Sequence, residues 1–386
     1  MKLDAERDAL TISPEELSSL GQQYDVIHNA LSLLPTVEIS NSVIQNALNE
    51  FDKLNNAQQT LFKAAVASLA SPSQTAKLHY TTTKNPMSRM LIAWSSRDNK
   101  NRAILEDKDN SLTLSIRSDQ EIKDLLVSVL SADNNTPAMP EFYMVLSATA
   151  VITLLAIVDY FKYDWHVSYL THAMPGQIFT VPDVMERLKD ATSQDSRWSL
   201  LFWEKVMPED MPRVPTQETL SQALDELLHA QLIRKDNSPK VKTEPALYSM
   251  TEKGTLLNDN LSQTTSKVAL SISIEKASRV FARHTCLYSR ATDHLWLFQL
   301  AYSKGKISTL DSTLFKKSLA EILASQKLET PATKAKLATS TKPDPTVSDA
   351  HKLTKSEPKP VLSCPKCKEP YLSGDIFCTK CGSRLP

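Results

Sequence analysis

Residues 142–158, FYMVLSATAVITLLAIV, form an uncharged run between Glu141 and Asp159. A helix that spans a bilayer needs about 20 predominantly apolar residues. This run is shorter, includes Ser147, Thr149 and Thr153, and lacks the flanking Lys/Arg clusters that orient a membrane span. We therefore expect a helix over residues 141–160 that is buried in a protein core. A membrane span is the alternative.

The composition is that of a globular chain without a net electrostatic preference. Its 386 residues are enough for two or three domains. Lys plus Arg equals Asp plus Glu, at 44 each, so no global field draws the chain to nucleic acid or to an anionic membrane. The first residues, MKLDAERDAL, lack the apolar core of a signal peptide. We expect a cytoplasmic protein.

Glycine is scarce, and this scarcity excludes common enzyme classes. The chain has six glycines, whereas an average usage of about 7% would give roughly 27. Dinucleotide folds and P-loops need clustered glycines that let the backbone approach a pyrophosphate. No such cluster exists here, and neither does a Gly-x-Ser-x-Gly or His-Glu-x-x-His motif. We expect a protein that is not an enzyme.

Upstream of the apolar run, helices give way to short strands. Ser13-Pro14-Glu15-Glu16 has the order of a helix start, with an N-cap, a proline at the first position and acids in the first turn. Apolar periodicity predicts further elements. These are helices from residue 40 and over 57–69, β-like runs at 77–82, 89–94, 102–105 and 112–116, and a helix over 119–130.

Downstream, residues 179–261 have a more specific order. A short helix over 181–188 precedes a helix over 216–230, then QLIRK, a polar loop at 236–244, a strand over 246–250 and TEKG. This order resembles a bacterial winged-helix domain, in which helix, strand, wing, strand and helix follow one another. An insertion with Trp198, Phe202 and Trp203 departs from the simplest version of that domain.

Two strands (279–289 and 294–302) and a helix (312–323) follow. Both halves therefore show helices, a β-meander and a closing helix, which suggests a diverged tandem duplication. We predict an α+β fold with domains at 1–170 and 171–328, the second containing the winged helix. The layout is loosely similar to that of type VII secretion chaperones, and no residue is carried over from them.

Residues 329–360 have the composition of a disordered linker, without an aromatic residue or a glycine. Residues 361–386 then contain two Cys-x-x-Cys pairs, Cys364 with Cys367 and Cys378 with Cys381. Two such turns supply the four thiolates of a tetrahedral zinc site. The alternative is a redox pair or disulfides. The stretch is similar to the small zinc ribbons that end many bacterial proteins, which implies one structural Zn²⁺ and no position for catalysis.

The function depends on what the winged-helix segment contacts. A DNA-binding regulator would place the helix over 216–230 in the major groove and a basic wing on phosphate. The predicted wing contains Arg234, Lys235, Lys240 and Lys242, but the helix contains Glu218, Asp225 and Glu226 and no Lys or Arg. Because phosphate contacts supply most of the non-specific affinity, we favour a protein-interaction adaptor and keep the regulator as the alternative.

Two further groups could have a role. A Cys-His-Asp nucleophile could be drawn from His284, Cys286, Asp293 and His294, although a buried structural cysteine is the ordinary interpretation. The aromatic run over 159–166, DYFKYDWH, is either a helix end packed into the core or a surface that binds a partner.

The zinc prediction is tested on reduced, full-length protein. Metal analysis should find one zinc per chain. Cys364→Ser or Cys381→Ser should release the metal without unfolding residues 1–328, because the linker separates the two parts. Absence of zinc from wild-type protein that was kept reduced throughout would contradict the site.

Overall fold

The structure is a computed structural model of the chain, and it divides into two compact units. The first is Met1–Lys327 and the second is Leu328–Pro386. The structure describes residues 1–4, 8–24, 26–82, 87–95, 101–108, 111–132, 142–190, 197–207, 214–236, 245–276, 279–292, 294–301, 303–324, 362–363 and 370–371. The predicted division of the first unit at residue 170 stays a prediction.

The first unit is built on one large antiparallel sheet, which has eleven strands among the described residues. In spatial order the strands are β1 (Lys2–Asp4), β2 (Ala9–Ile12), β6 (Ser111–Ser118), β5 (Asn101–Lys108), β4 (Ser88–Trp94), β3 (Gln74–Thr81), β11 (Ser266–Lys276), β12 (Arg279–Arg290), β13 (Leu295–Ala301), β14 (Lys304–Leu310) and β7 (Tyr143–Ser147). The mixture of this sheet with helices confirms the α+β class.

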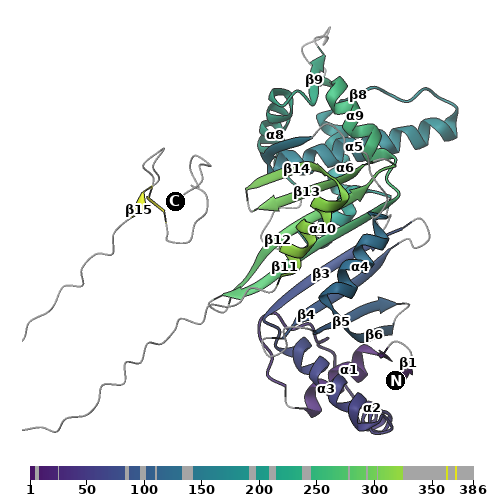
Figure 1. Cartoon of the computed structure of the whole chain (residues 1–386). Coiled ribbons are helices and arrows are strands. Elements are labelled where there is room, and N and C mark those ends of the chain that lie inside the picture. The colour runs from purple at the N-terminus through teal and green to yellow at the C-terminus, as the bar shows by residue number, and fades with distance from the viewer. Residues whose placement is uncertain are drawn as a thin grey trace, which may run out of the picture. The chain divides into compact units, whose positions relative to one another are not determined.

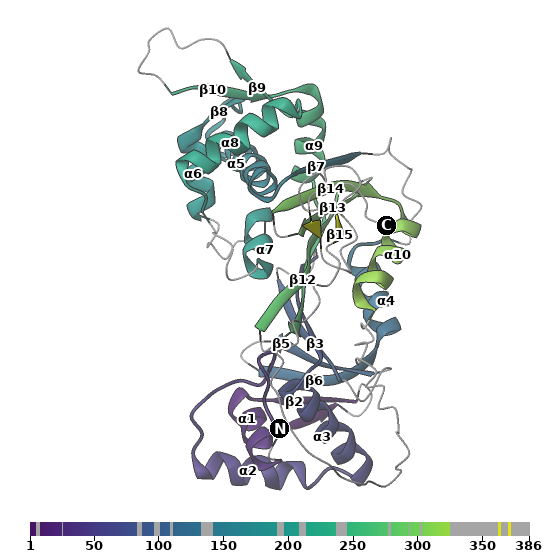
Figure 2. The ribbon, with the colours of Figure 1, turned by 90° about the vertical axis from the view of Figure 1, so that its left-hand side faces the viewer.

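Helices cover both faces of the large sheet (Figures 1 and 2). One face packs on α1 (Pro14–Gln23), α2 (Asn41–Phe51) and α3 (Asn56–Ala70) in the first half, and on α5 (Ala148–Thr171) and α7 (Ser199–Val206) in the second. The opposite face packs on α4 (Asp119–Val129) and α10 (Ser312–Leu323), which contact each other. The sheet therefore separates two apolar layers.

The predicted start of the first helix is confirmed. Ser13 is the N-cap of α1, its hydroxyl accepts a hydrogen bond from the Glu16 backbone N–H, and the Glu16 carboxylate accepts one from the Ser13 N–H. Pro14 occupies the first turn. The capping box satisfies two backbone donors that would otherwise lack partners at the helix end.

The prediction of one helix over residues 141–160 is wrong at both ends. Residues Tyr143–Ser147 form strand β7, which pairs with β14, and α5 begins only at Ala148 and continues to Thr171. Ser147 ends the strand and caps the helix, because its hydroxyl accepts a hydrogen bond from the Ala150 N–H. The apolar run thus supplies two elements that pack on each other.

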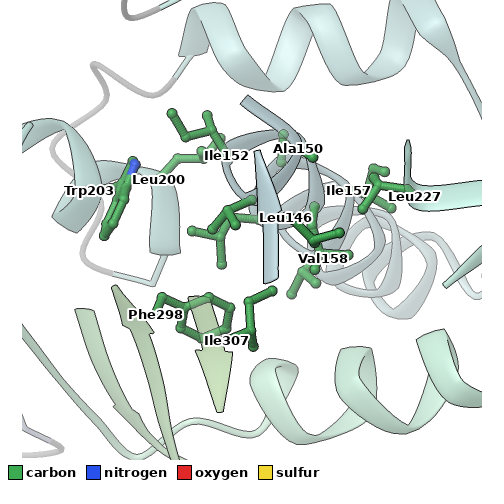
Figure 3. Packing of buried hydrophobic residues seen from close by; sticks show 14 of the residues in the cluster. Leu146, Ala150, Ile152, Ile157, Val158, Leu200, Trp203, Leu227, Phe298 and Ile307 are labelled. Atoms are coloured by element: carbon green, nitrogen blue, oxygen red, sulfur yellow. The ribbon is translucent and has the colours of Figure 1, made fainter. Parts of the chain in front are cut away.

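The first half of α5 is buried in the core, as expected. All residues from Ala150 to Asp159 are buried. Figure 3 shows Leu146 and Val158 near Phe298 and Ile307 of the sheet, and Ile157 beside Leu227 of the same apolar cluster. In the described part of the chain, no helix is long and apolar enough to cross a membrane.

The large sheet contains the same strand order twice. In the first half β2 pairs with β6 and is followed across the sheet by β5, β4 and β3; in the second half β7 pairs with β14 and is followed by β13, β12 and β11. Strands β3 and β11 join the halves in antiparallel pairing, with Leu78 opposite Leu270. Each meander ends in a helix, α4 or α10. This arrangement has the pattern that a duplication would leave.

A smaller antiparallel sheet, with three strands among the described residues, lies beyond α5. Its strands in order are β8 (Ile178–Thr180), β10 (Leu247–Met250) and β9 (Ile233–Asp236). The helices of this segment are α6 (Val181–Lys189), α7, α8 (Gln217–His229) and α9 (Glu252–Ser262). Leu220, Leu224 and Leu227 of α8 belong to the same apolar cluster as the buried half of α5.

Gly305 of β14 allows α5 to approach the sheet closely. A Cβ built at this position would lie 2.3 Å from Val151 Cγ2 of α5, well inside van der Waals contact. Gly305→Ala should therefore destabilise the first unit by about 1–3 kcal/mol through overpacking. The measurement is urea denaturation followed by circular dichroism.

Two comparison variants make this test specific. Val151→Ala in the Gly305→Ala background should recover part of the loss, giving a favourable coupling energy in a double-mutant cycle. Gly176→Ala, at an exposed position where the added Cβ would meet Asp164 at an ordinary 3.4 Å, should change stability by less than about 0.5 kcal/mol. Equal effects of the two glycine substitutions would contradict the packing account.

Candidate functional site

The four predicted zinc ligands, Cys364, Cys367, Cys378 and Cys381, lie outside the described residues. The structure does describe a short hairpin beside the first pair, β15 (Leu362–Ser363) with β16 (Pro370–Tyr371). In its register Ser363 is opposite Pro370, so the first Cys-x-x-Cys pair falls in the segment between the two strands. The zinc site stays a prediction.

The polar face of α8 is only partly available to a partner. Glu218 and Asp225 are exposed, as expected. Glu226 is half-buried, and its carboxylate accepts a hydrogen bond of 2.7 Å from the Ser147 backbone N–H. Glu226 is therefore not an exposed group that is free to contact a partner. Glu226 instead ties α8 to the junction of β7 and α5.

The basic residues predicted for the wing are described in part. Arg234 and Lys235 are exposed on β9, and the Arg234 Nε donates to Ser249 Oγ at 2.9 Å. Lys240 and Lys242 lie outside the described residues. The described part of this region thus offers two exposed cations beside a helix whose exposed side chains include no Lys or Arg.

Cys286 has the environment of a structural cysteine. It is fully buried on β12, and burial raises the pKa of its thiol to about 12. An activated nucleophile requires the opposite shift, toward the thiolate. Burial also lowers the pKa of His284, and Asp293 lies outside the described residues. The described geometry therefore provides no activated Cys-His-Asp arrangement.

The aromatic run at residues 159–166 divides between the core and the surface. Asp159 is buried, Tyr160 and Phe161 pack against the core, and Trp165 is exposed. The exposure continues beyond the predicted end of the helix, where Tyr169 is 72% exposed, Leu170 is 77% exposed and Met174 is 91% exposed. The outer half of α5 and the segment after it thus present apolar side chains to solvent.

We call this set the α5 apolar surface. Its members are large apolar side chains that are exposed on α5, on the following segment and at the start of β8: Tyr163, Trp165, Val167, Tyr169, Leu170, Met174 and Ile178. Within it the rings of Trp165 and Tyr169, four residues apart on the helix, stack with centroids 5.9 Å apart. Exposed large apolar side chains that gather on one part of the surface mark sites of interaction in globular proteins.

The α5 apolar surface carries almost no charge. Residues 163–178 contain no Lys or Arg, and their one acidic residue is Asp164. The Asp164 carboxylate accepts a hydrogen bond of 2.6 Å from the Gly176 N–H and so holds the segment after the helix against α5. At the edge of the surface, the Arg187 guanidinium lies 4.2 Å from the centre of the Tyr163 ring. The surface is therefore built locally, with Arg187 at its edge and no Lys or Arg within residues 163–178.

A buried carboxylate fixes the neighbouring helix. Helix α7 has Trp198 as its N-cap residue, which makes no side-chain cap. Asp159 of α5 supplies the cap, accepting hydrogen bonds from Ser199 N (3.0 Å) and Leu200 N (2.9 Å). Lys162 and Lys267 both donate to the Arg197 carbonyl just before this helix. These contacts connect α7 to the middle of α5.

Opposing effects act on the pKa of Asp159. Burial raises the pKa, whereas the two backbone hydrogen bonds and the Lys267 and Lys162 ammonium groups lower it. Burial dominates, so the net shift is upward. The group therefore acts as a structural cap that carries an electrostatic cost when ionised.

Sequence reasoning found only the beginning of the α5 apolar surface. It located the aromatic run, but it ended the helix at residue 160 and so excluded Tyr169, Leu170 and Met174. A visible signal was the lack of Lys and Arg through residue 178 combined with several large apolar side chains. Apolar side chains on a helix usually indicate a core, so only the structure shows that these lie outside it.

Comparison with known proteins gives matches among solved structures. No protein-family model matches the chain, and no curated protein matches it. Among solved structures, the Mycobacterium tuberculosis type VII secretion chaperone EspG5, in complex with the PE25–PPE41 dimer, matches with a TM-score of 0.42 and 11% identity. The match covers 82% of this chain and 95% of that chain. The match gives no residue correspondence.

Removal of the buried cap should destabilise the first unit. Asp159→Ala leaves two helix N–H groups without their acceptor, which should cost at least about 2 kcal/mol. Asp159→Asn, which keeps one acceptor oxygen, should cost less. The free energy of unfolding by urea is the measurement, and Asp259→Ala at an exposed position of α9 is the matched control.

The pH dependence of this loss has a defined sign. Because the folded state raises the pKa above its ordinary 3.8, the folded protein holds the Asp159 proton more tightly than the unfolded chain. The proton-linked stability is therefore complete below pH about 4 and is lost as pH rises through the folded pKa. The free energy of unfolding of wild type minus that of Asp159→Asn should therefore fall as the pH rises from about 4 through the folded pKa of Asp159. A difference that grows with pH would contradict the account.

Proposed function

We propose that this protein is a non-catalytic adaptor that binds another protein through the α5 apolar surface. The observation that carries this proposal is the exposure of Trp165, Tyr169 and Leu170 on a helix whose first half is the centre of the core, together with the exposure of Met174 just after that helix. Aromatic and Met side chains are enriched at protein interfaces, where they supply most of the contact area. A rigid helix limits the entropy lost on binding.

The chemistry of the surface favours an apolar, uncharged face of a partner polypeptide, best provided by an amphipathic helix. The exposed side chains of Tyr163, Val167 and Leu170 recur on α5 at the four- and three-residue spacings that form one stripe. A second helix can pack along such a stripe with ridges in grooves. An anionic membrane would instead call for Lys or Arg beside the apolar side chains, and residues 163–178 have none.

The remaining predicted modules complete this proposal. We infer that β8, α6 to α8, the β9–β10 pair and α9 form a winged helix, since the order of these elements and the antiparallel β9–β10 pairing are those of that domain. We infer a diverged duplication from the repeated strand order. The four cysteines of residues 361–386 would hold a structural zinc that adds a tethered contact.

The alternative function is a DNA-binding regulator. The observation in its favour is that Arg234 and Lys235 are exposed on β9, next to the segment that would be the wing. The exposed side chains of α8 oppose it, because they include Glu218 and Asp225 and no cation that would contact phosphate. The adaptor is therefore the function proposed.

Two pairs of substitutions separate these functions. Tyr169→Ser with Leu170→Ser should raise the Kd for the partner at least tenfold, a loss of about 1.4 kcal/mol or more, as expected for central interface residues. Arg234→Glu with Lys235→Glu should leave that Kd within about twofold. The measurement uses a partner captured from the source organism, identified, purified and titrated by calorimetry.

The controls address folding and surface hydrophobicity. Leu256→Ser and Leu314→Ser remove exposed leucines elsewhere, and they should not alter the Kd. A salt-dependent shift of duplex DNA that is abolished by the Arg234/Lys235 reversal, with partner binding unaffected by Tyr169 and Leu170, would support the regulator instead.

A further inference from the structure

Strand β7 forms one edge of the large sheet. It pairs with β14 on one side, and no strand of the described residues pairs with its other side (Figure 2). An open edge presents backbone donors and acceptors to any chain that can lie alongside it. Edge strands that have no recognition role are usually very short, bulged, covered or protected by charge.

The pairing with β14 shows which backbone groups face outward. The Phe142 carbonyl accepts from Thr309 N, and Ala148 N donates to the Ser303 carbonyl, both at 3.1 Å. Because backbone groups alternate sides along a strand, the even-numbered residues face β14. Tyr143, Val145 and Ser147 face the open edge.

One of these three residues already has its partner. The Ser147 N–H donates to Glu226, which closes that end of the edge. Tyr143 and Val145 remain, with two N–H and two C=O groups in the pattern that one added strand requires. Only two residues of this edge have outward-facing N–H and C=O groups without a partner strand among the described residues. Such a short open edge suits a short extended segment of polypeptide.

The side chains beside this edge are apolar and exposed. Met144 and Leu146 are buried against α5, whereas Tyr143 is 57% exposed and Val145 is 51% exposed on the opposite face of the strand. An aromatic and a β-branched side chain at alternate positions are the residues that stabilise cross-strand pairs. An added strand would cover both.

The charge around β7 is positive. The Lys306 ammonium lies 5.0 Å from the centre of the Tyr143 ring, the Lys253 ammonium lies 5.5 Å from that of Phe142, and Lys304 is exposed on β14. No carboxylate among the described residues forms a salt bridge with any of these lysines. Glu226, the acidic group in contact with β7, is hydrogen-bonded to Ser147.

From these observations we infer that β7 binds an extended, acidic segment of a partner polypeptide, which adds a strand along Tyr143 and Val145. Backbone pairing would supply affinity, apolar side chains at alternate positions would cover Tyr143 and Val145, and Glu or Asp residues would approach Lys306 and Lys304. Edge-to-edge pairing of two copies of this chain is disfavoured, because it would bring both lysine sets to one seam. This site is separate from the α5 apolar surface.

A random library of ten-residue peptides, displayed and selected on the full-length chain, tests this inference. The selected peptides should be enriched in Asp and Glu. Within each peptide, β-branched or aromatic residues should occupy alternate positions. When bound, the selected peptides should slow hydrogen exchange of the Tyr143 and Val145 backbone amides of the chain. Peptides of mixed charge, or peptides that protect other residues, would overturn the inference.

Val145→Pro is the decisive variant. Its missing N–H faces the open edge, so the pairing of β7 with β14 is retained, and proline is tolerated at such positions. It should weaken binding of the selected peptides at least tenfold, whereas Val145→Thr should bind within about threefold of wild type. Equal binding by wild type and Val145→Pro would overturn the inference.

Two further variants keep the test independent of folding and of the proposed function. If Val145→Pro lowers the melting temperature substantially, Lys304→Glu with Lys306→Glu replaces it and should also weaken binding at least tenfold. Tyr169→Ser with Leu170→Ser should leave peptide binding unchanged, because the two surfaces are distinct. A loss of binding in this last variant would show that the peptides bind α5 and would overturn the inference.

Discussion

The close packing of α5 on the large sheet is the contact on which the rest of the structure depends. Val151 of α5 lies directly over Gly305 of β14, with no space for a Cβ. The same half of α5 is surrounded by α7, α8 and β13, and its residues from Ala150 to Asp159 are all buried. One helix therefore joins the large sheet to the small one.

This constraint also explains the exposed surface. Because the first half of α5 is fixed in the core, its second half must project beyond the sheet, where it has few neighbours (Figure 1). The buried polar groups around it serve the architecture, as Asp159 does for α7. On β3, burial lowers the pKa of His79 to about 4, with Arg89, Lys205 and Lys77 acting in the same direction, so the imidazole is neutral near pH 7. The chemistry of this part of the chain is that of packing and association.

Much of the fold could be predicted from local sequence signals. The helix start at Ser13, the first meander, two strands of the second meander and the closing helices are visible because turn residues and apolar periodicity are local properties. Strands β11 and β14 were not predicted. The junction at Ser147 was missed because a short apolar strand and the start of a buried helix look alike in sequence. Its strand character comes from β14, about 160 residues away in the chain. The role of Glu226 depends on another distant contact, with the Ser147 N–H, and so it could not be predicted either.

The candidate site was only partly predictable for a related reason. Aromatic residues after a buried helix indicate either core or interface, and sequence alone does not distinguish the two. The most direct test of the adaptor account is photo-crosslinking in the source organism, with p-benzoyl-phenylalanine in place of Leu170 and, as a control, in place of Leu314. The account predicts a light-dependent adduct with one defined protein from position 170 and none with that protein from position 314. No protein adduct at position 170, or the same adducts from both positions, would contradict it.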